Sequence, residues 1–359
     1  MKLGNEGNMT QDSNSLLASI IVVTWNAKRY VDECVRSLGK NRDAVSSEII
    51  VVDNASTDGT PELIEAVLPQ ACLIRNASNL GFARANNLGI ARSRGKYLFL
   101  INSDVTLPPG CIAKLAALME ENPSIGLLGP QMLGPQVGAA HAAGLPGEIR
   151  RSTMRFPTVW NQFCRALGLD LVLKSRWAGG FLMPDFAHDR TRDVEVLNGW
   201  FWVVRREALE QVGPLDERFF MYGEDIDWCY RFRQAGWRCV FYAGARAVHY
   251  GGASSAAAPV RFYLDMQRAN LQYWKKHHGP LARAAYYGIT LVHHLLRTAG
   301  HGLAYLVKPS SQKESAYKLQ RSLAALRWLL SGYLSDDAGE HHETAPLQPF
   351  RESAPTTRL

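Results

Sequence analysis

The segment from Phe219 to Asp227 contains three carboxylates, those of Glu224, Asp225 and Asp227, at the predicted start of a helix. A lone histidine, His249, follows at the end of a later apolar run. Acids at a helix start commonly cap it, because they accept hydrogen bonds from free backbone N–H groups. Acids that also lie near a second acidic loop and a histidine would form a catalytic site. The elements of the first hundred residues decide between these interpretations.

The first hundred residues predict a sheet with its ligand site at one edge. Apolar runs typical of buried parallel strands occur at 18–24, 48–53 and 96–102, with a shorter one at 72–75, and helical spacing lies between them. Strands that alternate with helices indicate a parallel, doubly wound α/β sheet. In such a sheet, ligands bind beyond the carboxyl ends of the strands.

Three of these strand ends carry polar residues. They are Thr24 and Asn26, then Asp53, Asn54 and Asp58, and finally Asn102, Ser103 and Asp104. Each cluster alone fits an ordinary turn, since Asn, Asp and Ser are common turn residues. At one shared edge their carboxylates repel one another unless a ligand or cation binds, which favours a binding site. The first strand is followed by Thr-Trp-Asn-Ala-Lys-Arg rather than G-x-G-x-x-G, which argues against a dehydrogenase.

The later part of the chain predicts a less regular arrangement. Residues 134–190 are rich in Gly, Pro, Arg and aromatic residues and predict a long, partly irregular excursion. Regular spacing then returns. It predicts strands at 194–197, 200–204, 237–242 and 247–250, and helices at 206–212 and 224–234.

The basic charge of the chain is concentrated near its C-terminal end. Residues 279–334 carry seven Lys or Arg against the single acid Glu314, whereas the whole chain has a formal charge of +7. A basic appendage indicates an anionic partner, either a membrane or a nucleic acid. Residues 286–307 are apolar overall but contain three histidines and an arginine, which makes them too polar for a clear transmembrane helix.

One predicted helix in this appendage allows two interpretations. Leu319, Leu323, Leu326 and Leu330 lie on one helical face, with basic residues nearby. Such a helix either lies on an anionic membrane surface or packs on the main domain.

The cysteines and the ends of the chain bear on its compartment. The six cysteines form no C-x-x-C pair, which is typical of ordinary thiols in a reducing compartment. The N-terminal residues are polar and show no apolar signal region, so the cytoplasm is the expected location. Residues 1–17 and 335–359 are polar and predicted to be disordered.

Several of these segments resemble the family 2 glycosyltransferases. The matching segments are residues 20–24, 51–60, 79–87 and 100–104. The later segments 205–207, 212–220, 224–225 and 248–252 are similar to the rhamnosyltransferase-like branch of that family. The resemblance covers residues 18–278 and implies a GT-A fold, a Rossmann-like nucleotide-diphospho-sugar transferase. Residues 279–334 would follow it as a basic, amphipathic helical appendage, with membrane association as one of its two interpretations.

The resemblance implies a donor site and a metal site. The nucleotide sugar would contact the polar residues of all three strand ends, together with Gly81 and Asn86. Asp104 matches the last acid of the metal-binding D-x-D motif, whose first acid is replaced here by Asn102. His249 matches a second ligand for Mg²⁺ or Mn²⁺, with a buried strand histidine as the alternative.

The resemblance also implies the catalytic residues. Asp225 matches the catalytic base, with a helix cap as the alternative, and Glu224 is the neighbouring supporting acid. Trp200 and Asp227 would contact the acceptor, although Trp200 also fits core packing. Two opposing effects act on the pKa of Asp225, since a helix start lowers it and neighbouring acids raise it.

The implied function is inverting transfer of a sugar, with rhamnose suggested by the branch, from a nucleotide-diphosphate donor. The acceptor would be lipid-linked or a polysaccharide in cell-envelope glycan synthesis. We expect a cytoplasmic protein, peripheral on the inner face of the cell membrane, with no nucleic acid as partner. A processive polysaccharide synthase is one alternative, but it would show Q-x-x-R-W and clear transmembrane spans. A non-catalytic module that binds nucleotide or glycan is the other.

Overall fold

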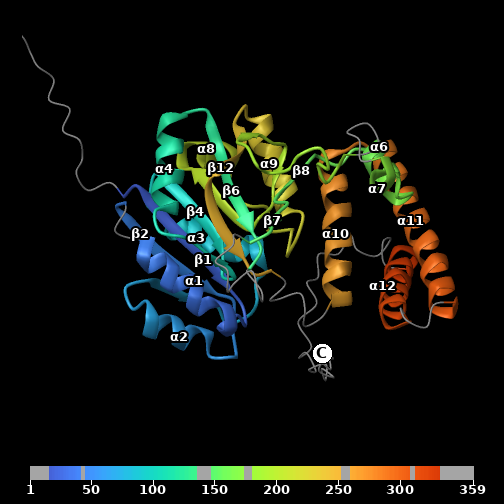
Figure 1. Cartoon of the computed structure of the whole chain (residues 1–359), viewed down its shortest axis with the longest axis horizontal. Coiled ribbons are helices and arrows are strands. Elements are labelled where there is room, and N and C mark those ends of the chain that lie inside the picture. The colour runs from blue at the N-terminus through green and yellow to red at the C-terminus, as the bar shows by residue number, and fades with distance from the viewer. Residues whose placement is uncertain are drawn as a thin grey trace, which may run out of the picture.

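A computed structural model describes most of the chain as a mixed sheet covered by helices on both faces, with further helices beside it (Figure 1). The described residues are 16–41, 45–135, 147–173, 180–251, 259–307 and 312–331. The prediction of disorder for residues 335–359 lies outside these ranges, as does that for residues 1–17 up to residue 15. At its end this prediction is wrong, because Leu17 donates its backbone N–H to the Ser46 carbonyl at 2.9 Å.

The first part of the chain forms four parallel strands with helices between them. The elements are β1 (Ala18–Thr24), α1 (Lys28–Asn41), β2 (Ser47–Asp53), α2 (Thr60–Val67), β3 (Cys72–Arg75), α3 (Phe82–Arg92) and β4 (Tyr97–Asn102). β1 lies between β2 and β4 and is almost wholly buried. Strands covered on both faces are apolar throughout, which explains why their sequence runs predicted them.

The later strands turn this parallel sheet into a mixed one. The elements are β5 (Val105–Thr106), α4 (Cys111–Glu121), β6 (Ile125–Leu133), β11 (Phe201–Arg205) and β12 (Arg238–His249). The strand order is β3-β2-β1-β4-β11-β6-β12-β5. β11 runs antiparallel to both β4 and β6 and lies between them. Its place in the sheet depends on pairing with distant residues, which no local pattern reveals.

The two strands predicted at 237–242 and 247–250 form one strand, β12. It pairs with β6 in parallel, but the register shifts between Tyr242 and Arg246. The residues inside this irregularity interrupt the alternation of side chains, so the sequence read as two strands. The separation predicted from the pattern is therefore wrong.

The excursion between β6 and β11 contains short elements. They are β7 (Ile149–Arg150), β8 (Thr153–Met154), α6 (Val159–Ala166), α7 (Leu169–Leu173), β9 (Arg192–Asp193) and β10 (Val196–Leu197). A capping box starts α6, because the Thr158 hydroxyl accepts from the Asn161 N–H while the Asn161 side chain accepts from the Thr158 N–H. α6 packs against a C-terminal helix rather than against the sheet.

The core has two layers, one on each face of the sheet. Alternate residues of β4 belong to different layers, with Leu98 and Leu100 on one face and Phe99 and Ile101 on the other. α1 and α4 cover the second face, whereas α3, α8 (Arg206–Val212) and α9 (Glu224–Gln234) cover the first.

Three long helices stand to one side of the sheet (Figure 1). They are α10 (Pro259–His277), α11 (Pro280–Val307) and α12 (Gln312–Ser331). α12 packs against α10 and α11 and buries Leu326 and Leu329. The packed interpretation of this helix is therefore the one that the structure shows, although its support comes from the neighbouring helices rather than the sheet.

Candidate active site

The carboxyl ends of β1, β2 and β4 bring the predicted donor residues to one edge of the sheet. Thr24 pairs with Asp53, and Val23 pairs with Asn102, in the parallel registers of these strands. Ser103 and Asp104 follow directly after β4. The strand-end clusters are therefore neighbours in space, as the predicted topology requires.

Two buried polar side chains at this edge have an atom free for a ligand. Asp53 uses Oδ2 to accept a hydrogen bond from the Ser56 N–H at 3.0 Å. Its Oδ1, and the Thr24 Oγ1 beside it, are buried and have no hydrogen-bond partner among the described residues. Buried polar atoms are rarely left unpaired in native proteins, so these two fit contacts to a bound donor.

Asn26 and Asp58 shape the loops at this edge. Asn26 has a positive φ of 47°, and its Oδ1 accepts from the Thr57 N–H at 2.8 Å. Asp58 accepts from the N–H groups of Lys28 and Thr60. Burial works to raise the pKa of Asp58, but these hydrogen bonds and that of the Thr60 hydroxyl outweigh it and lower the pKa. Both side chains therefore tie the β1 and β2 loops together.

Asn54 and Gly81 connect the donor edge to the later half of the chain, whereas Asn86 bonds within α3. The Asn54 Nδ2 donates to the Gly81 carbonyl at 3.0 Å, and the Asn86 Nδ2 donates to the Phe82 carbonyl at 2.9 Å. Gly81 has φ +82°, and a Cβ there would lie 2.4 Å from the Phe220 carbonyl oxygen. Only glycine fits this approach of two backbones.

Asp104 and His249, from distant parts of the sequence, face one another. β5 and β12 pair at this point, and the His249 Nε2 lies 3.4 Å from the Asp104 Oδ1. The Asp104 Oδ2 accepts from the Gly251 N–H at 3.1 Å. Both side chains are nearly buried, and the His249 Nδ1 has no hydrogen-bond partner among the described residues.

A carboxylate and an imidazole side by side are a donor set that a divalent cation accepts. Within the described ranges, no group of three or more potential ligands occurs. Mg²⁺ and Mn²⁺ commonly complete their coordination with substrate phosphates and water, so two protein ligands fit such an ion. Asn102, in the first D-x-D position, donates its backbone N–H to the Trp200 carbonyl at 3.1 Å.

The paired acids Glu224 and Asp225 begin α9, directly after Gly223 in the left-handed region. Burial, and next the charge of Asp225, raise the pKa of Glu224 well above its ordinary value. Burial also raises the pKa of Asp225 to about 6, although hydrogen bonds from backbone groups, including Ile226 and Gly199, lower it. A carboxyl group with a pKa near neutrality is suited to accept a proton during catalysis.

Trp200 joins this acid pair to the Asp104–His249 pair. Its ring lies 4.5 Å from the His249 ring, centroid to centroid, at 33°. The preceding residue, Gly199, reaches Asp225 through its backbone. Asp225 and His249 are therefore linked by their contacts with two consecutive residues, Gly199 and Trp200. Whether Trp200 also contacts an acceptor stays a prediction.

Asp227 is placed differently from its prediction. Its carboxylate is fully buried and forms salt bridges to Arg231 at 2.9 Å and to Lys276 and His277 at 2.6 Å. Burial works to raise its pKa, but the hydrogen bonds from His277 and Lys276 outweigh it and lower the pKa. A carboxylate used in this way is not available to an acceptor, so the predicted acceptor contact disagrees with the structure.

The sequence reasoning missed Lys276 and His277, which fix the first turn of α9 from the end of α10. They lie at the last residues that the family resemblance covers and belong to no motif there. A run of basic residues at a helix end is usually a solvated cap, so no local signal pointed to Asp227.

Comparisons with known proteins show similarity to glycosyltransferases. Residues 19–145 match the sequence family described as glycosyl transferase family 2. An N-acetylglucosaminyl-diphospho-decaprenol L-rhamnosyltransferase of Mycobacterium tuberculosis is 28% identical over 255 residues, which cover 67% of this chain and 78% of the relative. The low-salt glycan biosynthesis hexosyltransferase Agl10 of Haloferax volcanii is 26% identical over 226 residues, covering 60% of this chain and 61% of that protein.

Among solved structures, the mannosyltransferase PcManGT from Pyrobaculum calidifontis, in complex with GDP-Man and Mn²⁺, is a distant likeness. It shows 17% identity and a TM-score of 0.46 over 89% of both chains.

The mixed sheet with its parallel N-terminal strands agrees with the GT-A fold, and its N-terminal part matches glycosyl transferase family 2. Residues 19–145 thus match glycosyl transferase family 2, and the cited relatives extend the similarity to glycosyltransferases over about two thirds of the chain.

Proposed function

We propose that this protein is an inverting glycosyltransferase that moves a sugar from a nucleotide-diphosphate donor to a hydroxyl group of its acceptor. The observation that carries this proposal is the Asp225 carboxyl group. Its pKa is raised to about 6, and it is joined through Gly199 and Trp200 to the pair of His249 and Asp104. A base on one side and a diphosphate site on the other are what a direct displacement needs.

In the proposed step, the acceptor oxygen attacks the anomeric carbon of the donor sugar. The bond between that carbon and the diphosphate oxygen breaks, and the nucleoside diphosphate leaves with the bonding electrons. Asp225 takes the proton from the attacking hydroxyl. Attack opposite the leaving group inverts the configuration at the anomeric carbon. Burial raises the pKa values of both adjacent acids, and that of Asp225 lies at about 6, so Asp225 ionises near neutral pH.

Asp104 and His249 would hold Mg²⁺ or Mn²⁺ together with the donor diphosphate. When bound, such an ion supplies Lewis-acid stabilisation of the charge that develops on the leaving phosphate oxygens. The protein's own contribution is to fix the two ligands: the Gly251 N–H orients Asp104, and the Trp200 ring orients His249. Asp53 and Thr24 offer their unpaired oxygen atoms to the nucleoside part of the donor.

The sugar and the acceptor follow from the M. tuberculosis relative, which is named for transfer of L-rhamnose to a diphospho-decaprenol-linked N-acetylglucosamine. We infer a rhamnose donor and an acceptor linked to a lipid diphosphate, in cell-envelope glycan synthesis. The match covers most of the relative, which supports the inference for the whole reaction.

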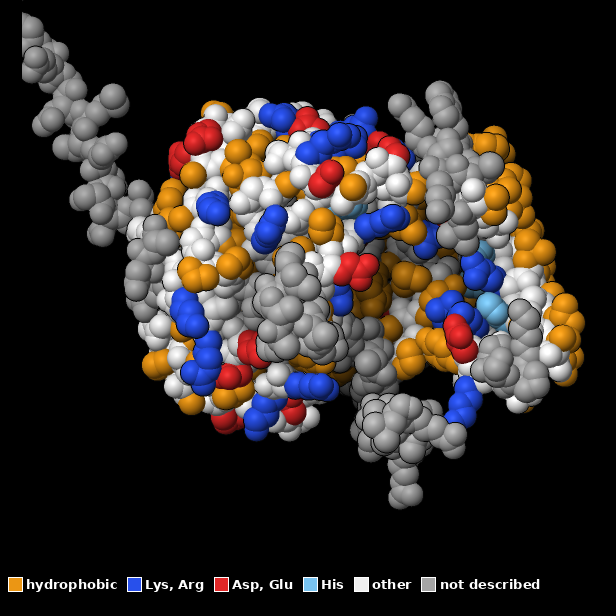
Figure 2. All heavy atoms as spheres, viewed as in Figure 1, with side chains coloured by type: hydrophobic (Ala, Val, Ile, Leu, Met, Phe, Trp, Pro, Cys, Tyr) orange, Lys and Arg blue, Asp and Glu red, His pale blue; other side chains and the backbone are white. Residues whose placement is uncertain are grey.

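A lipid-linked acceptor requires contact with a membrane surface, which we propose for the outer face of α11. This face exposes Leu295, Leu296, Leu303 and Leu306, and the adjoining α6 exposes Trp160. Figure 2 shows hydrophobic side chains along the edge of the molecule that these helices form. Among the described residues, no helix has the length and hydrophobicity needed to span a bilayer. Peripheral attachment at the cytoplasmic side of the membrane fits these properties.

The test is the Asp225→Asn protein. We expect it to bind the nucleotide sugar with wild-type affinity but to lose transfer by at least about a hundredfold, because a positioned base contributes about 10²–10⁴. In the wild type, kcat/KM should fall about tenfold per pH unit below pH 6, where Asp225 becomes protonated. A matched Asp189→Asn protein, changed at an exposed site, should behave like the wild type.

A non-catalytic binding module would bind the donor and show neither transfer nor donor hydrolysis in any variant. An Asp225→Asn protein with wild-type transfer would rule out the assignment of the base.

A further inference from the structure

Three arginines from three helices gather around the Tyr263 ring, away from the active site. The Arg321 guanidinium of α12 lies over the Tyr263 ring at 4.3 Å from its centroid. Burial raises the pKa of the Tyr263 hydroxyl, whereas the nearby charges of Arg321, Arg297 and Arg165 lower it. Arg297 belongs to α11 and Arg165 to α6. We call these three arginines with Tyr263 the arginine cluster.

The arginine cluster is not neutralised within the described part of the chain. The salt bridges found there on α10 and α12 are those of Arg268, Lys276, His277 and Lys318, and none of them includes a cluster arginine. Burial lowers the pKa of Arg165, and the charge of Asp170 opposes this only in part. Arg165 and Arg321 are only partly exposed, and holding like charges at such positions is costly unless an anion balances them.

Buried polar atoms beside the cluster also lack partners. His294 is fully buried, with its ring centroid 5.9 Å from that of Tyr263, and neither of its ring nitrogens has a hydrogen-bond partner among the described residues. The same is true of the Arg321 Nε and the Thr298 Oγ1. Native proteins leave few such atoms unsatisfied, so several in one place indicate a ligand with several acceptor atoms.

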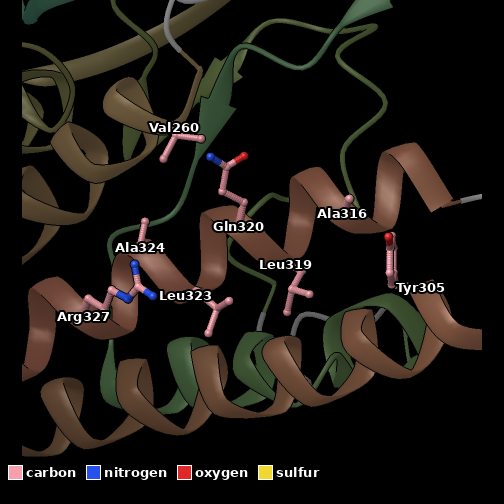
Figure 3. A pocket seen from close by; sticks show the side chains of 8 residues that line it. All are labelled: Val260, Tyr305, Ala316, Leu319, Gln320, Leu323, Ala324 and Arg327. Carbon is pink, nitrogen blue, oxygen red and sulfur yellow. The ribbon is translucent and has the colours of Figure 1, made fainter.

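An apolar groove of about 440 Å³ shares α10 and α12 with the cluster. Val260 of α10, one helical turn before Tyr263, lines the groove. Gln320, next to Arg321 in α12, and Ala324, about one turn after Arg321, line it as well. Figure 3 shows Gln320 and Ala324 pointing toward Val260, while Leu323 points toward the helix that carries Tyr305. The groove is lined mainly by hydrocarbon, and its cationic neighbours lie on the same helices.

Lys, Arg and His side chains are visible together over these helices in Figure 2. We propose that the arginine cluster binds the diphosphate of the lipid-linked acceptor, and that the adjoining groove receives the first part of its hydrocarbon chain. Arginine is suited to the headgroup because its planar fork donates two hydrogen bonds to one phosphate. The proposal rests on the proposed function for the lipid nature of the ligand.

The position of the cluster fits an acceptor site. Tyr263 precedes Ala269 by six residues, about 9 Å along the axis of α10. A Cβ on Gly223, next to the catalytic acids, would lie 3.1 Å from the Ala269 Cβ. α10 therefore lies between the cluster and the acids. A diphosphate held on one side of α10 leaves its attached sugar to extend toward Asp225.

The test compares binding by the full-length wild type and Arg321→Gln, without donor. Inorganic pyrophosphate is titrated by calorimetry, and neutral phosphatidylcholine vesicles carrying a polyprenyl diphosphate are titrated by co-sedimentation. We expect Arg321→Gln to weaken both by at least about tenfold, since a lost hydrogen bond to a charged group is worth that much. Lys313→Gln removes the same charge at an exposed site of α12 and should change neither. Arg297→Gln, at an exposed position, repeats the test if Arg321→Gln does not fold.

Three results would overturn the proposal. The first is unchanged binding of pyrophosphate and vesicles in both arginine variants, and the second is an equal loss of binding in Lys313→Gln. The third is Arg321-dependent binding of phosphatidylglycerol vesicles that is as tight as the binding of polyprenyl-diphosphate vesicles. The last would identify a general anionic surface as the ligand. Asp225→Asn should keep pyrophosphate binding. If the wild type transfers no sugar to a polyprenyl-diphosphate acceptor but pyrophosphate binding still depends on Arg321, the proposed function fails while the diphosphate site stands.

Discussion

The adjacent carboxyl groups of Glu224 and Asp225 are each subject to opposing effects on the pKa. The start of α9 favours their charged forms, while burial and their mutual repulsion favour the protonated forms. The sequence shows the helix start and the neighbouring acids but not the burial. Burial depends on residues far along the chain, such as Ala269, which packs beside the preceding Gly223, so only the structure gives the direction of the shift.

Glu224→Gln should make the stability of the protein less dependent on pH. The pKa of Glu224 is raised in the folded state, so its stabilising contribution is complete below pH 4.5 and is lost as pH rises toward the folded value. In that window the wild type loses up to about 1.4 kcal/mol of unfolding free energy per pH unit from this group. Urea unfolding at pH 5 and pH 7 measures the slope.

The amide that Glu224→Gln introduces does not ionise, so this variant should lose less stability than the wild type between these two pH values. Glu121→Gln, at an exposed position of α4, serves as the control and should keep the wild-type slope. Equal slopes for the wild type and Glu224→Gln would contradict the buried, raised carboxyl group.

Asp104→Ala should lose both metal binding and transfer. We expect chelation to abolish wild-type activity and added Mn²⁺ to restore it, whereas Asp104→Ala should stay at least about a hundredfold less active with or without metal. Titration of Mn²⁺ followed by its electron paramagnetic resonance signal gives a second measurement, in which His249→Ala should also bind more weakly. Full turnover in excess chelator would remove the metal from the mechanism.

At the scale of elements, the sequence predicted well wherever a local pattern decides the structure. β1, β2 and β4 are buried on both faces, so their apolar runs marked them directly. The facing of Asp104 and His249 was available only through the family resemblance, because 144 intervening residues separate them. The position of β11 and the continuity of β12 through its register shift depend on non-local pairing, which periodicity does not contain.

Asp227→Asn should destabilise the protein by separating α9 from α10. Removing one member of a buried ion pair costs about 3–5 kcal/mol, because the remaining charges stay buried without a partner. The His277 side chain would lose its carboxylate partner, and Lys276 would keep only its salt bridge to Asp216. Chemical denaturation measures the loss.

Asp32→Asn is the matched control. It also removes an aspartate that pairs with an arginine four residues later, Arg36, but this pair is exposed, and its loss should change stability little. If the two variants unfold at the same denaturant concentration, the buried network does not stabilise the junction of α9 and α10.

At the scale of the whole molecule, polar and apolar functions are separated in space. The sheet edge carries the acids, whereas the C-terminal helices carry the exposed leucines and the arginine cluster. The sequence located the basic charge in residues 279–334 and left two interpretations for α12, either on a membrane surface or packed on the main domain. The structure packs that helix and leaves α11 outermost, with His294 of α11 buried and its leucines exposed.

Leu296→Glu should weaken binding to anionic vesicles. Taking one leucine out of apolar contact loses about 1.5–3 kcal/mol, which corresponds to at least about a tenfold lower partition coefficient. Liposome flotation measures the partition. Gln70→Glu adds the same charge at an exposed turn between α2 and β3, on the far side of the molecule from α11 (Figure 1), and should have little effect. An equal loss in both variants would indicate simple charge repulsion rather than insertion of α11.

The position of β11 has a consequence for biosynthesis. β4 and β6 are made early and lie within the segment that matches the sequence family, yet each gains its shared neighbour only when residues 201–205 have been synthesised. Until then both strands present open edges on the ribosome, where unpaired strands are prone to wrong partners. Residues 19–145, which match the sequence family, therefore do not complete the sheet by themselves. The nascent sheet closes only after β11 is inserted between strands that were already made.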